Sequence, residues 1–319
     1  MKVVRDLKNF TNSKKTVLTI GTFDGVHIGH QKIIKQLVET AQSKNLTSVV
    51  LTFFPHPRMV LQNDIAVRMI DTVDEKIQWL DQLGVDVLVI HPFSKSFSRT
   101  TAVTFARDII ANQLNAKEVI IGYDHRFGQN REATIEDLET YGQLYNFKVA
   151  VIPAQDIESI AVSSTKIRKA MSNSDLSTVR QYLNRPFRLT GLVVKGDQIG
   201  KSIGFPTANV AIEEKYKLWP SNGVYLVQSR IDQQNVWGMM NIGNRPTVAG
   251  KKTTIEVHFF DFNKNLYEQT IALDIHVKIR EENKFDSLES LKKQLQKDQK
   301  LCLKTITAFP KRTATFTKN

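Results

Sequence analysis

The sequence has a single cysteine, Cys302, among 319 residues. One thiol cannot form an internal disulfide or a multi-cysteine zinc site, and this usage is typical of a reducing compartment. No run approaches the roughly 18 consecutive apolar residues that a membrane-spanning helix needs. The first eight residues contain no apolar block of the secretory kind. The sequence therefore predicts a cytoplasmic protein that does not enter a membrane.

Acidic residues are fewer than basic ones, 32 against 44, which leaves a net charge of +12 and favours anionic partners. The last forty residues hold ten basic and five acidic residues, so a nucleic-acid-binding tail is one interpretation. A solvated helix face is the other, and we favour it because carboxylates interrupt the basic residues. Hydrophobic residues at 41% and charged residues at 24% exclude disorder throughout and are typical of a globular chain.

The first half alternates short apolar runs with segments of helical period, which is typical of βαβ units with a parallel sheet. Helices are predicted by the stripe Ile33, Ile34, Leu37 and Val38, by a capping box of Thr72 and Glu75 before a stop at Gly84, and over 101–114. The predicted strands are Val17 to Ile20, Val49 to Phe54, Val85 to Ile90, Val119 to Ile121 and Val149 to Ile152.

The second half has short β runs separated by glycine and proline, with period-two alternation over 254–262 and 271–279. This pattern predicts an antiparallel barrel or sandwich. A capping box of Asp286 and Glu289, with Leu288, Leu291 and Leu295 on one stripe, predicts a last helix. The length suggests two domains, and the change of pattern near Pro186 gives domains of 1–183 and 184–319.

Two histidines follow the first predicted strand, in a glycine-containing turn that enters a helix. His27 and His30 are three residues apart and face the same way there. Imidazole N–H groups and a helix N-terminus both attract phosphate, and Gly29 allows a close approach to the backbone. Two alternatives remain: a zinc site that adds Asp24 and His56 but lacks cysteine ligands, and surface histidines at a helix cap.

Two further turns fit phosphate. Residues 122–128 follow the fourth strand, and Ser163, Ser164, Thr165 and Arg168 open a helix after the fifth. Hydroxyls, helix amides and the planar guanidinium can hold a triphosphate. A plain helix cap explains either turn alone, but three such turns at the carboxyl edge of one sheet favour a ligand.

His27-Ile28-Gly29-His30 with the serine-rich helix start resembles the H-x-G-H nucleotidyltransferases. Together with 53–57 and 122–128, these segments look like the adenylyltransferase module of bacterial bifunctional riboflavin kinase/FAD synthetases. The resemblance implies a Rossmann-like α/β domain in which the FMN phosphate attacks the α-phosphorus of ATP and releases pyrophosphate. It gives catalytic roles to His27, His30 and Arg168, and phosphate or nucleotide contacts to Gly21, Phe23, Asp24, Gly29, Asp124, Ser163, Ser164 and Thr165.

In the second half, Gly196 and Gly200 enclose three residues, whereas a P-loop has four between its glycines. The segment Gly204-Phe205-Pro206-Thr207-Ala208-Asn209 is more specific, because an extended chain points Thr207 and Asn209 to one side. Their oxygens suit Mg²⁺. In the strand over 254–262, Glu256 is a candidate general base, although an exposed strand glutamate is the alternative interpretation.

These segments, with 223–225, 238–247 and 280–285, look like the riboflavin kinase module, which implies an antiparallel barrel with a C-terminal helix. The resemblance implies that Thr207 and Asn209 contact Mg-ATP and that Glu256 activates the ribityl 5′-hydroxyl. We assign further nucleotide contacts to Gly196, Gly200, Lys201 and Gly204. The candidate flavin contacts are His56, Pro57, His125, Arg245, Arg280 and Phe285.

The chain departs from that family at two positions, with His125 where phenylalanine is usual and Lys201 where arginine is usual. The resemblance implies conversion of riboflavin to FMN and of FMN to FAD, with Mg²⁺ and ATP, in a monomer or weak homo-oligomer that binds no nucleic acid. One alternative keeps the first module with another phosphorylated acceptor. The other, motivated by the charge of +12, is a nucleic-acid-binding protein.

Overall fold

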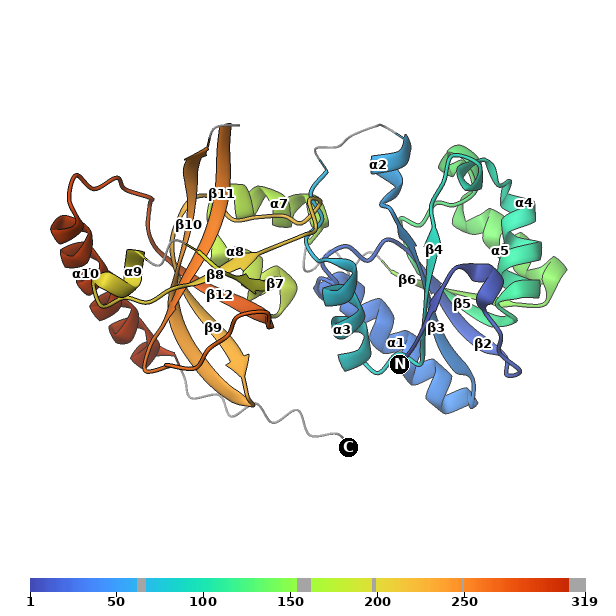
Figure 1. The fold of residues 1–319 in the computed structure, drawn as a ribbon. Helices are drawn as coiled ribbons and strands as arrows, with labels where there is room; N and C mark the ends of the chain where they lie inside the picture. The colour runs from blue at the N-terminus through green and yellow to red at the C-terminus, as the bar shows by residue number, and fades with distance from the viewer. Residues whose placement is uncertain (62–66, 154–161, 197–198, 248–249, 310–319) are drawn as a thin grey trace. The chain divides into compact units, whose positions relative to one another are not determined.

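The computed structural model describes residues 1–61, 67–153, 162–196, 199–247 and 250–309. For Ile199 and for residues 245–247 and 250–252 it describes the backbone alone. The described chain forms two compact units (Figure 1). The first comprises Met1–Lys169, Gln181–Asn184 and Tyr216–Leu218, and the second Ala170–Arg180, Arg185–Lys215 and Trp219–Asn319. We keep 183/184 as the proposed domain boundary.

The first unit is built on a six-stranded sheet in the order β1-β4-β3-β2-β5-β6, in which all pairs are parallel. Each predicted strand is present, and the pattern missed only β1, a short edge strand. The chain runs outward from β2 to one edge and then returns to β5 on its other side. The carboxyl ends of β2 and β5 therefore flank the reversal of strand order, where open α/β sheets bind ligands. The strands are β1 (Lys2–Arg5), β2 (Thr16–Ile20), β3 (Thr47–Phe54), β4 (Val87–Pro92), β5 (Ala116–Gly122) and β6 (Lys148–Ile152).

Helices cover both faces of this sheet (Figure 1). One apolar cluster joins the inner faces of α1 and α3 to the sheet through Ile34, Leu37 and Leu80. The other contains Phe105, Ile110 and Leu138 and lies on the opposite face. The helices are α1 (Ile28–Lys44), α2 (Pro57–Leu61), α3 (Val73–Gln82), α4 (Ala102–Thr104), α5 (Ile135–Tyr145) and α7 (Ser164–Ser172).

The three helix starts agree with the sequence signals, and one helix differs in type. His27 caps α1, and Thr72 with Glu75 forms the predicted capping box of α3. The single helix expected over 101–114 is instead α4 followed by a π-helix over Phe105–Gln113. Leu114 donates its N–H to the Ile109 carbonyl, five residues back, and hydrophobic spacing does not distinguish that bonding from an α-helix.

The second unit is a closed barrel of antiparallel strands in the order β10-β11-β8-β7-β12-β9. Period-two alternation places Ile255 and Val257 in its core, at 1% and 0% exposure, with Glu256 on the other face. The strands are β7 (Phe187–Val194), β8 (Ala208–Ala211), β9 (Gly223–Ile231), β10 (Gln234–Thr247), β11 (Gly250–Phe259) and β12 (Thr270–Arg280). The shorter helices are α8 (Leu176–Leu183) and α9 (Ile199–Ser202).

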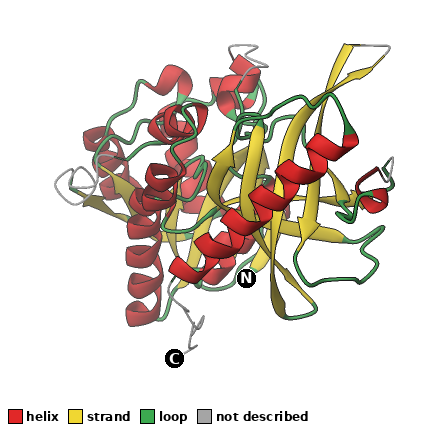
Figure 2. Cartoon of the chain, turned by 90° about the vertical axis from the view of Figure 1, so that its left-hand side faces the viewer, coloured by secondary structure: helices red, strands yellow, loops and turns green. Residues whose placement is uncertain are grey.

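The last helix, α10 (Leu288–Ala308), lies across the barrel strands (Figure 2). Leu291 and Leu295 pack on the cluster around Leu226 and Cys302, as the stripe predicts. Leu288 does not, because it is 55% exposed at the helix start. The predicted capping box is also wrong by one residue, since Ser287 and Ser290 form it. The Ser287 hydroxyl accepts the Ser290 N–H and the Ser290 hydroxyl accepts the Ser287 N–H, one residue beyond the amides that Asp286 and Glu289 would have reached.

Within the described ranges, no helix is both long enough and apolar enough to cross a bilayer.

The Arg280–Asp298 pair attaches α10 to β12 and predicts a stability effect. Arg280 Nη2 lies 2.8 Å from Asp298 Oδ2, with side chains 17% and 3% exposed. Asp298→Ala should lower the free energy of unfolding by about 3 kcal/mol, because it leaves a buried guanidinium unpaired. Lys293→Ala, which breaks an exposed pair with Glu289, should cost less than about 1 kcal/mol. Equal losses in urea unfolding would contradict this assignment.

Candidate active sites

The turn between β2 and α1 brings the two predicted histidines together. His27 is the N-cap of α1, and its Nδ1 accepts the His30 N–H at 3.3 Å. The two imidazole rings stack with centroids 3.6 Å apart and planes 15° apart. Phe23, predicted as a nucleotide contact, presents its ring to His30 at 5.2 Å in an edge-to-face arrangement. No described residue bonds to His30 Nδ1, so this buried nitrogen is available to a ligand.

Burial determines the charge of these histidines. It lowers the pKa of His27 to about 4 and the pKa of His30 well below its ordinary value. Positive charge on His27 and Lys76 lowers the pKa of His30 further. Two stacked imidazolium ions would repel, whereas neutral rings avoid that cost. The pair therefore offers neutral N–H donors at pH 7 in the unliganded protein.

Asp24 and Arg168 form a buried ion pair beside the histidines. Asp24 is 1% exposed, and its second carboxylate oxygen accepts the Ile70 N–H at 2.9 Å. Burial raises the pKa of Asp24, and the positive charges of Arg168 and Lys76 oppose that rise. Arg168 also donates Nε–H to the Arg68 carbonyl at 2.7 Å. The carboxylate thus orients Arg168, and a nucleotide contact of Asp24 itself stays a prediction.

Three carbonyl groups of this turn accept side-chain donors. Lys76 Nζ reaches Thr22 O at 2.7 Å, Ser164 Oγ reaches Asp24 O at 2.9 Å, and Gln31 Nε2 reaches Val26 O at 2.8 Å. Phe23 and Val26 have positive φ angles of 45° and 39°, which are costly for residues with a Cβ. These tethers hold a strained backbone in place.

Lys76 is a site residue that the sequence pattern did not reveal. It is 3% exposed, and burial lowers its pKa while Asp24 and Asp71 oppose that shift. Its charge also acts on His56, whose pKa burial lowers to about 4. In an amphipathic helix a lysine reads as a surface residue, and the structure alone distinguishes this one. His56 thus lies within reach of the charges of Lys76 and Arg168, and Pro57 begins α2 beside it.

The other predicted phosphate turns differ in what they present. Ser163 Oγ accepts the Lys166 N–H at 3.2 Å, so this serine caps α7 as the plain interpretation predicted. Thr165 and Asp124 are exposed. In the turn over 122–128, burial lowers the pKa of His125 to about 4. His125 stacks on Phe127, with centroids 6.1 Å apart, and its buried Nε2 has no partner among the described residues.

In the barrel, three predicted residues meet where β8 lies against β11. Asn209 is the register partner of Glu256, and Thr207 Oγ1 lies 3.4 Å from Glu256 Oε2. His258, two residues on, bonds through Nδ1 to Pro206 O at 2.8 Å and fixes the chain before Thr207. Glu256 is half-buried, and its role as a general base stays a prediction. This cluster combines oxygen ligands with a carboxylate that can accept a proton.

The glycines of the barrel loop lie close to these residues. A Cβ at Gly196 would overlap the Asn209 side chain, and one at Gly200 would overlap Phe205 O. Gly204 has φ of +86° and ends the turn before Phe205. Side chains at Gly196 and Gly200 would displace Asn209 and the chain before Thr207. This close approach explains the glycine spacing without a P-loop. Lys201 is exposed in α9.

The candidate flavin contacts in the second unit include a residue with a structural role. Arg280 donates from Nε, Nη1 and Nη2 to Asp298 and the Glu281 carbonyl. Its guanidinium lies over the Phe285 ring at 5.7 Å. Arg280 therefore anchors α10, and Arg280 and Phe285 both stay predictions as flavin contacts. The side chain of Arg245 lies outside the described ones.

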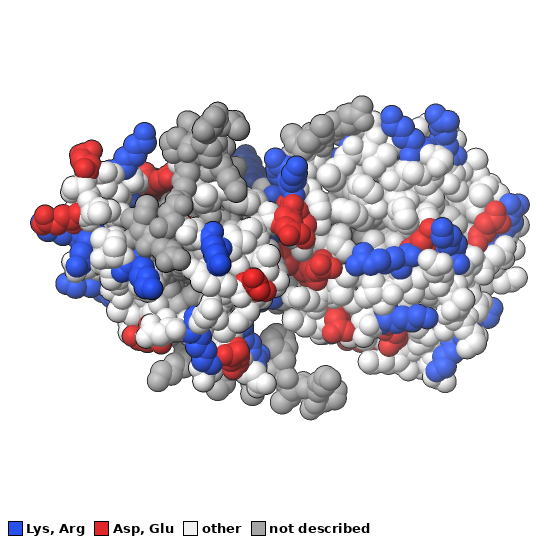
Figure 3. All heavy atoms as spheres, viewed as in Figure 1, with Lys and Arg blue, Asp and Glu red and all other residues white. Residues whose placement is uncertain are grey.

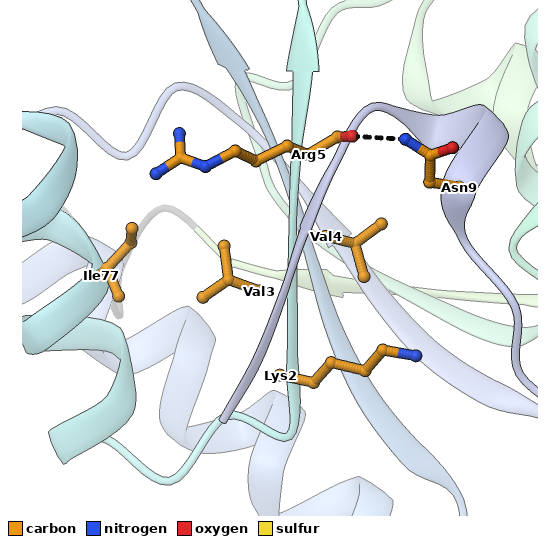
Figure 4. Close-up of a pocket in the computed structure, with 6 residues that line it drawn as sticks. All are labelled: Lys2, Val3, Val4, Arg5, Asn9 and Ile77. Atoms are coloured by element: carbon orange, nitrogen blue, oxygen red, sulfur yellow. Dashed lines mark hydrogen bonds between the residues drawn. The ribbon is translucent and has the colours of Figure 1, made fainter.

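A separate pocket beside β1 contains none of the predicted residues (Figure 4). Its one drawn hydrogen bond joins Asn9 Nδ2 to Arg5 O at 2.9 Å. The pocket is lined by Lys2, Val3, Val4, Arg5, Asn9 and Ile77.

The zinc alternative for the histidine pair needs at least three metal ligands. Among the described residues, no group of three His, Cys, Asp or Glu side chains could hold a metal ion.

The buried, unpartnered His125 predicts a pH effect on stability. Its pKa is about 4 in the folded chain and 6.5 ordinarily. The unfolded chain therefore binds more protons between these values, and stability falls as pH drops from 6.5 toward 4. His125→Phe should remove a share of about 1 kcal/mol of that fall. Urea unfolding at pH 7 and pH 4.5 tests this, with Tyr123→Phe as control; an unchanged difference would contradict it.

Comparisons with known proteins agree with the division of chemistry between the two halves. A family model described as FAD synthetase matches residues 9–166, and one described as riboflavin kinase matches residues 183–306. A bifunctional riboflavin kinase/FMN adenylyltransferase of Buchnera aphidicola subsp. Schizaphis graminum is 37% identical over 303 residues, 93% of this chain and 96% of that protein. The Escherichia coli K12 protein of the same name is 35% identical over 94% of this chain and 96% of its own length.

A solved Streptococcus pneumoniae structure, described as a macrolide-efflux protein, has a TM-score of 0.85 at 30% identity. It covers 95% of this chain and 99% of its own. The match over both units supports the fold, and the relatives above cover nearly the whole chain at more than 30% identity. The chain belongs to the family of bifunctional riboflavin kinase/FMN adenylyltransferases.

Proposed function

We propose that this chain phosphorylates riboflavin to FMN in its barrel and adenylylates FMN to FAD in its α/β unit, using ATP in both steps. The observation that carries the transferase assignment is the buried Asp24–Arg168 pair beside the stacked histidines. It fixes a guanidinium next to neutral N–H donors at a helix N-terminus, and all three attract phosphate. The kinase assignment rests on the meeting of Thr207, Asn209 and Glu256.

In the transfer step, an FMN phosphate oxygen attacks the α-phosphorus of ATP, and the bond to the β-phosphate oxygen breaks to release pyrophosphate. Arg168, held by Asp24, stabilises the negative charge on the transferring group. His27 and His30 donate hydrogen bonds to phosphate oxygens from neutral rings. His56 and His125 lie in the turns that we assign to the flavin or the adenine.

In the kinase step, the riboflavin 5′-hydroxyl attacks the γ-phosphorus of ATP and ADP leaves. Glu256 accepts the hydroxyl proton. Thr207 shares a hydrogen bond with that carboxylate at 3.4 Å, so the hydroxyl and the phosphate ligands are held as one group. Catalysis here depends on positioning, because phosphoryl transfer needs little covalent help from the protein.

The donor set of the barrel site fits Mg²⁺, since Thr207, Asn209 and Glu256 supply hydroxyl, amide and carboxylate oxygens. We propose that Thr207 and Asn209 hold the ion, which would neutralise charge on the ATP phosphates. In the transferase unit, the phosphates themselves would carry the ion, because the described side chains near the histidines are mostly nitrogen donors.

The remaining predictions concern partners and place. We retain a cytoplasmic location, a monomer or weak homo-oligomer and an absence of nucleic-acid binding as predictions. On the face drawn in Figure 3, lysine and arginine side chains alternate with aspartate and glutamate. That mixture supports the interpretation of +12 as a solvated surface rather than as a single binding stripe.

The direct test incubates purified protein with riboflavin, ATP and Mg²⁺ and separates the flavins over time. We expect FMN to appear before FAD. FMN alone would mean that the first unit acts on another phosphorylated acceptor, and unchanged riboflavin would overturn the kinase assignment.

Glu256→Gln should reduce riboflavin phosphorylation by about 10²- to 10⁴-fold, because the amide cannot accept the hydroxyl proton. FMN adenylylation should remain unchanged, since Glu256 lies in the other unit. Both rates are measured on one preparation by flavin chromatography. Glu289→Gln serves as the matched control, because this glutamate is exposed in α10. Kinase activity retained in Glu256→Gln would contradict the base assignment.

His30→Ala should give the reverse pattern, with FMN adenylylation reduced by about 10²-fold or more and the kinase unaffected. The physical reason is the loss of a preorganised donor to the transferring phosphate. Single-turnover formation of FAD from FMN and ATP measures it. Loss of both activities in a folded protein would show that the two sites are not independent.

A further inference from the structure

A tripeptide from the kinase half of the sequence belongs to the first unit. Tyr216–Leu218 lies in sequence between β8 and β9 of the barrel, yet it is part of the first compact unit. It pairs with Met69 as a parallel bridge. Met69 N–H donates to Tyr216 O at 2.6 Å, and Leu218 N–H donates to Met69 O at 2.7 Å. The family match to the transferase half ends at residue 166, before this tripeptide.

Lys217 is the buried centre of the tripeptide. Its side chain is 0% exposed and forms an ion pair with Glu75, which is 1% exposed. Lys217 Nζ also donates to the Ile70 carbonyl at 2.6 Å. A charged amine is rarely buried so completely, because desolvation is costly unless both pairing and hydrogen bonding compensate.

Ile70 connects this lysine to the transfer site. Its carbonyl accepts from Lys217, and its N–H donates to Asp24 at 2.9 Å. Asp24 in turn holds Arg168. Two residues, Ile70 and Asp24, therefore link a buried amine to the guanidinium that we assign to the transferring phosphate.

The tripeptide also reaches the side that we assign to the flavin. The Tyr216 ring lies 5.0 Å from Phe54, which precedes Pro55 and His56. Tyr216 Oη accepts the Val73 N–H at 3.4 Å, at the start of α3. The tripeptide thus contacts two parts of the predicted transfer site: Ile70, which holds Asp24, and Phe54, which precedes the candidate flavin contacts.

We propose that Lys217 is a positioning residue of the adenylyltransferase site, and that the site is complete only with the tripeptide Tyr216–Leu218. The proposal rests on the proposed function of the first unit. A buried ion pair can often be replaced by apolar residues without loss of stability. What an apolar pair could not supply is a donor at the Ile70 carbonyl, and this donor fixes the residue whose N–H holds Asp24.

The test uses the full-length protein and two variants. Lys217→Met removes the amine and leaves Glu75 buried without its ion pair to Lys217. Lys217→Met with Glu75→Gln removes both charges and keeps an acceptor for the Thr72 N–H, which Glu75 accepts at 2.9 Å. Lys215→Met is the matched control, because it removes a positive charge two residues away at an exposed position. Thermal midpoints, kinase rate, and kcat and KM of FMN adenylylation are measured for each.

We expect the double variant to regain the thermal midpoint of the unaltered protein while its kcat for FMN adenylylation stays at least tenfold lower. Its KM for FMN and its kinase rate should not change. A double variant that regains kcat together with its midpoint would overturn the proposal, because Lys217 would then act on stability alone. The same holds if Lys217→Met keeps full kcat. An unaltered protein that makes no FAD from FMN would instead refute the proposed function.

Discussion

The ion pair of Asp24 and Arg168 is the interaction on which the transferase site depends. A carboxylate at 1% exposure is costly, and its pKa is raised by that burial. The cost is offset only while Arg168 and the Ile70 N–H both remain in place. Arg168 comes from α7, Ile70 from the chain before α3, and Asp24 from the turn after β2. The ion pair and the Ile70 hydrogen bond therefore hold these three segments together. The proposed phosphate site is thereby supported by a buried carboxylate that is already paired within the protein.

The barrel site reaches a similar end by a different physical means. Its three oxygen-bearing residues are brought together by strand register, since Asn209 lies opposite Glu256 in the ladder. Glycines at 196 and 200 allow the loop to approach, because a Cβ there would overlap Asn209 or Phe205. The backbone hydrogen bonds between β8 and β11, which the barrel needs in any case, therefore set the positions of Asn209 and Glu256. No buried ion pair is required, and the carboxylate stays available for proton transfer.

Much of the fold could be predicted because it follows from periodicity and local caps. The strands from Val17 to Ile152 and the starts of α1 and α3 follow from apolar runs, His27 and the Thr72–Glu75 box. The wrong predictions have local causes. The capping box of α10 is formed by Ser287 and Ser290 rather than by the predicted acidic residues. The π-helix over Phe105–Gln113 has a hydrophobic spacing that does not distinguish it from an α-helix. Lys76, Lys217 and the pairing of Asp24 with Arg168 could not be predicted. Their roles depend on burial in the tertiary structure, and the sequence alone does not show which charged residues are buried.

The strain in the turn after β2 explains why so many buried groups converge there. Phe23 and Val26 adopt positive φ, and such a backbone persists only where its surroundings determine it several times over. Lys76, Ser164 and Gln31 each donate to a carbonyl of this turn. Those carbonyl dipoles would repel a phosphate if they were free to turn toward it. Engaging them from the protein side leaves N–H donors to face the anion, so the tethers serve stability and binding together.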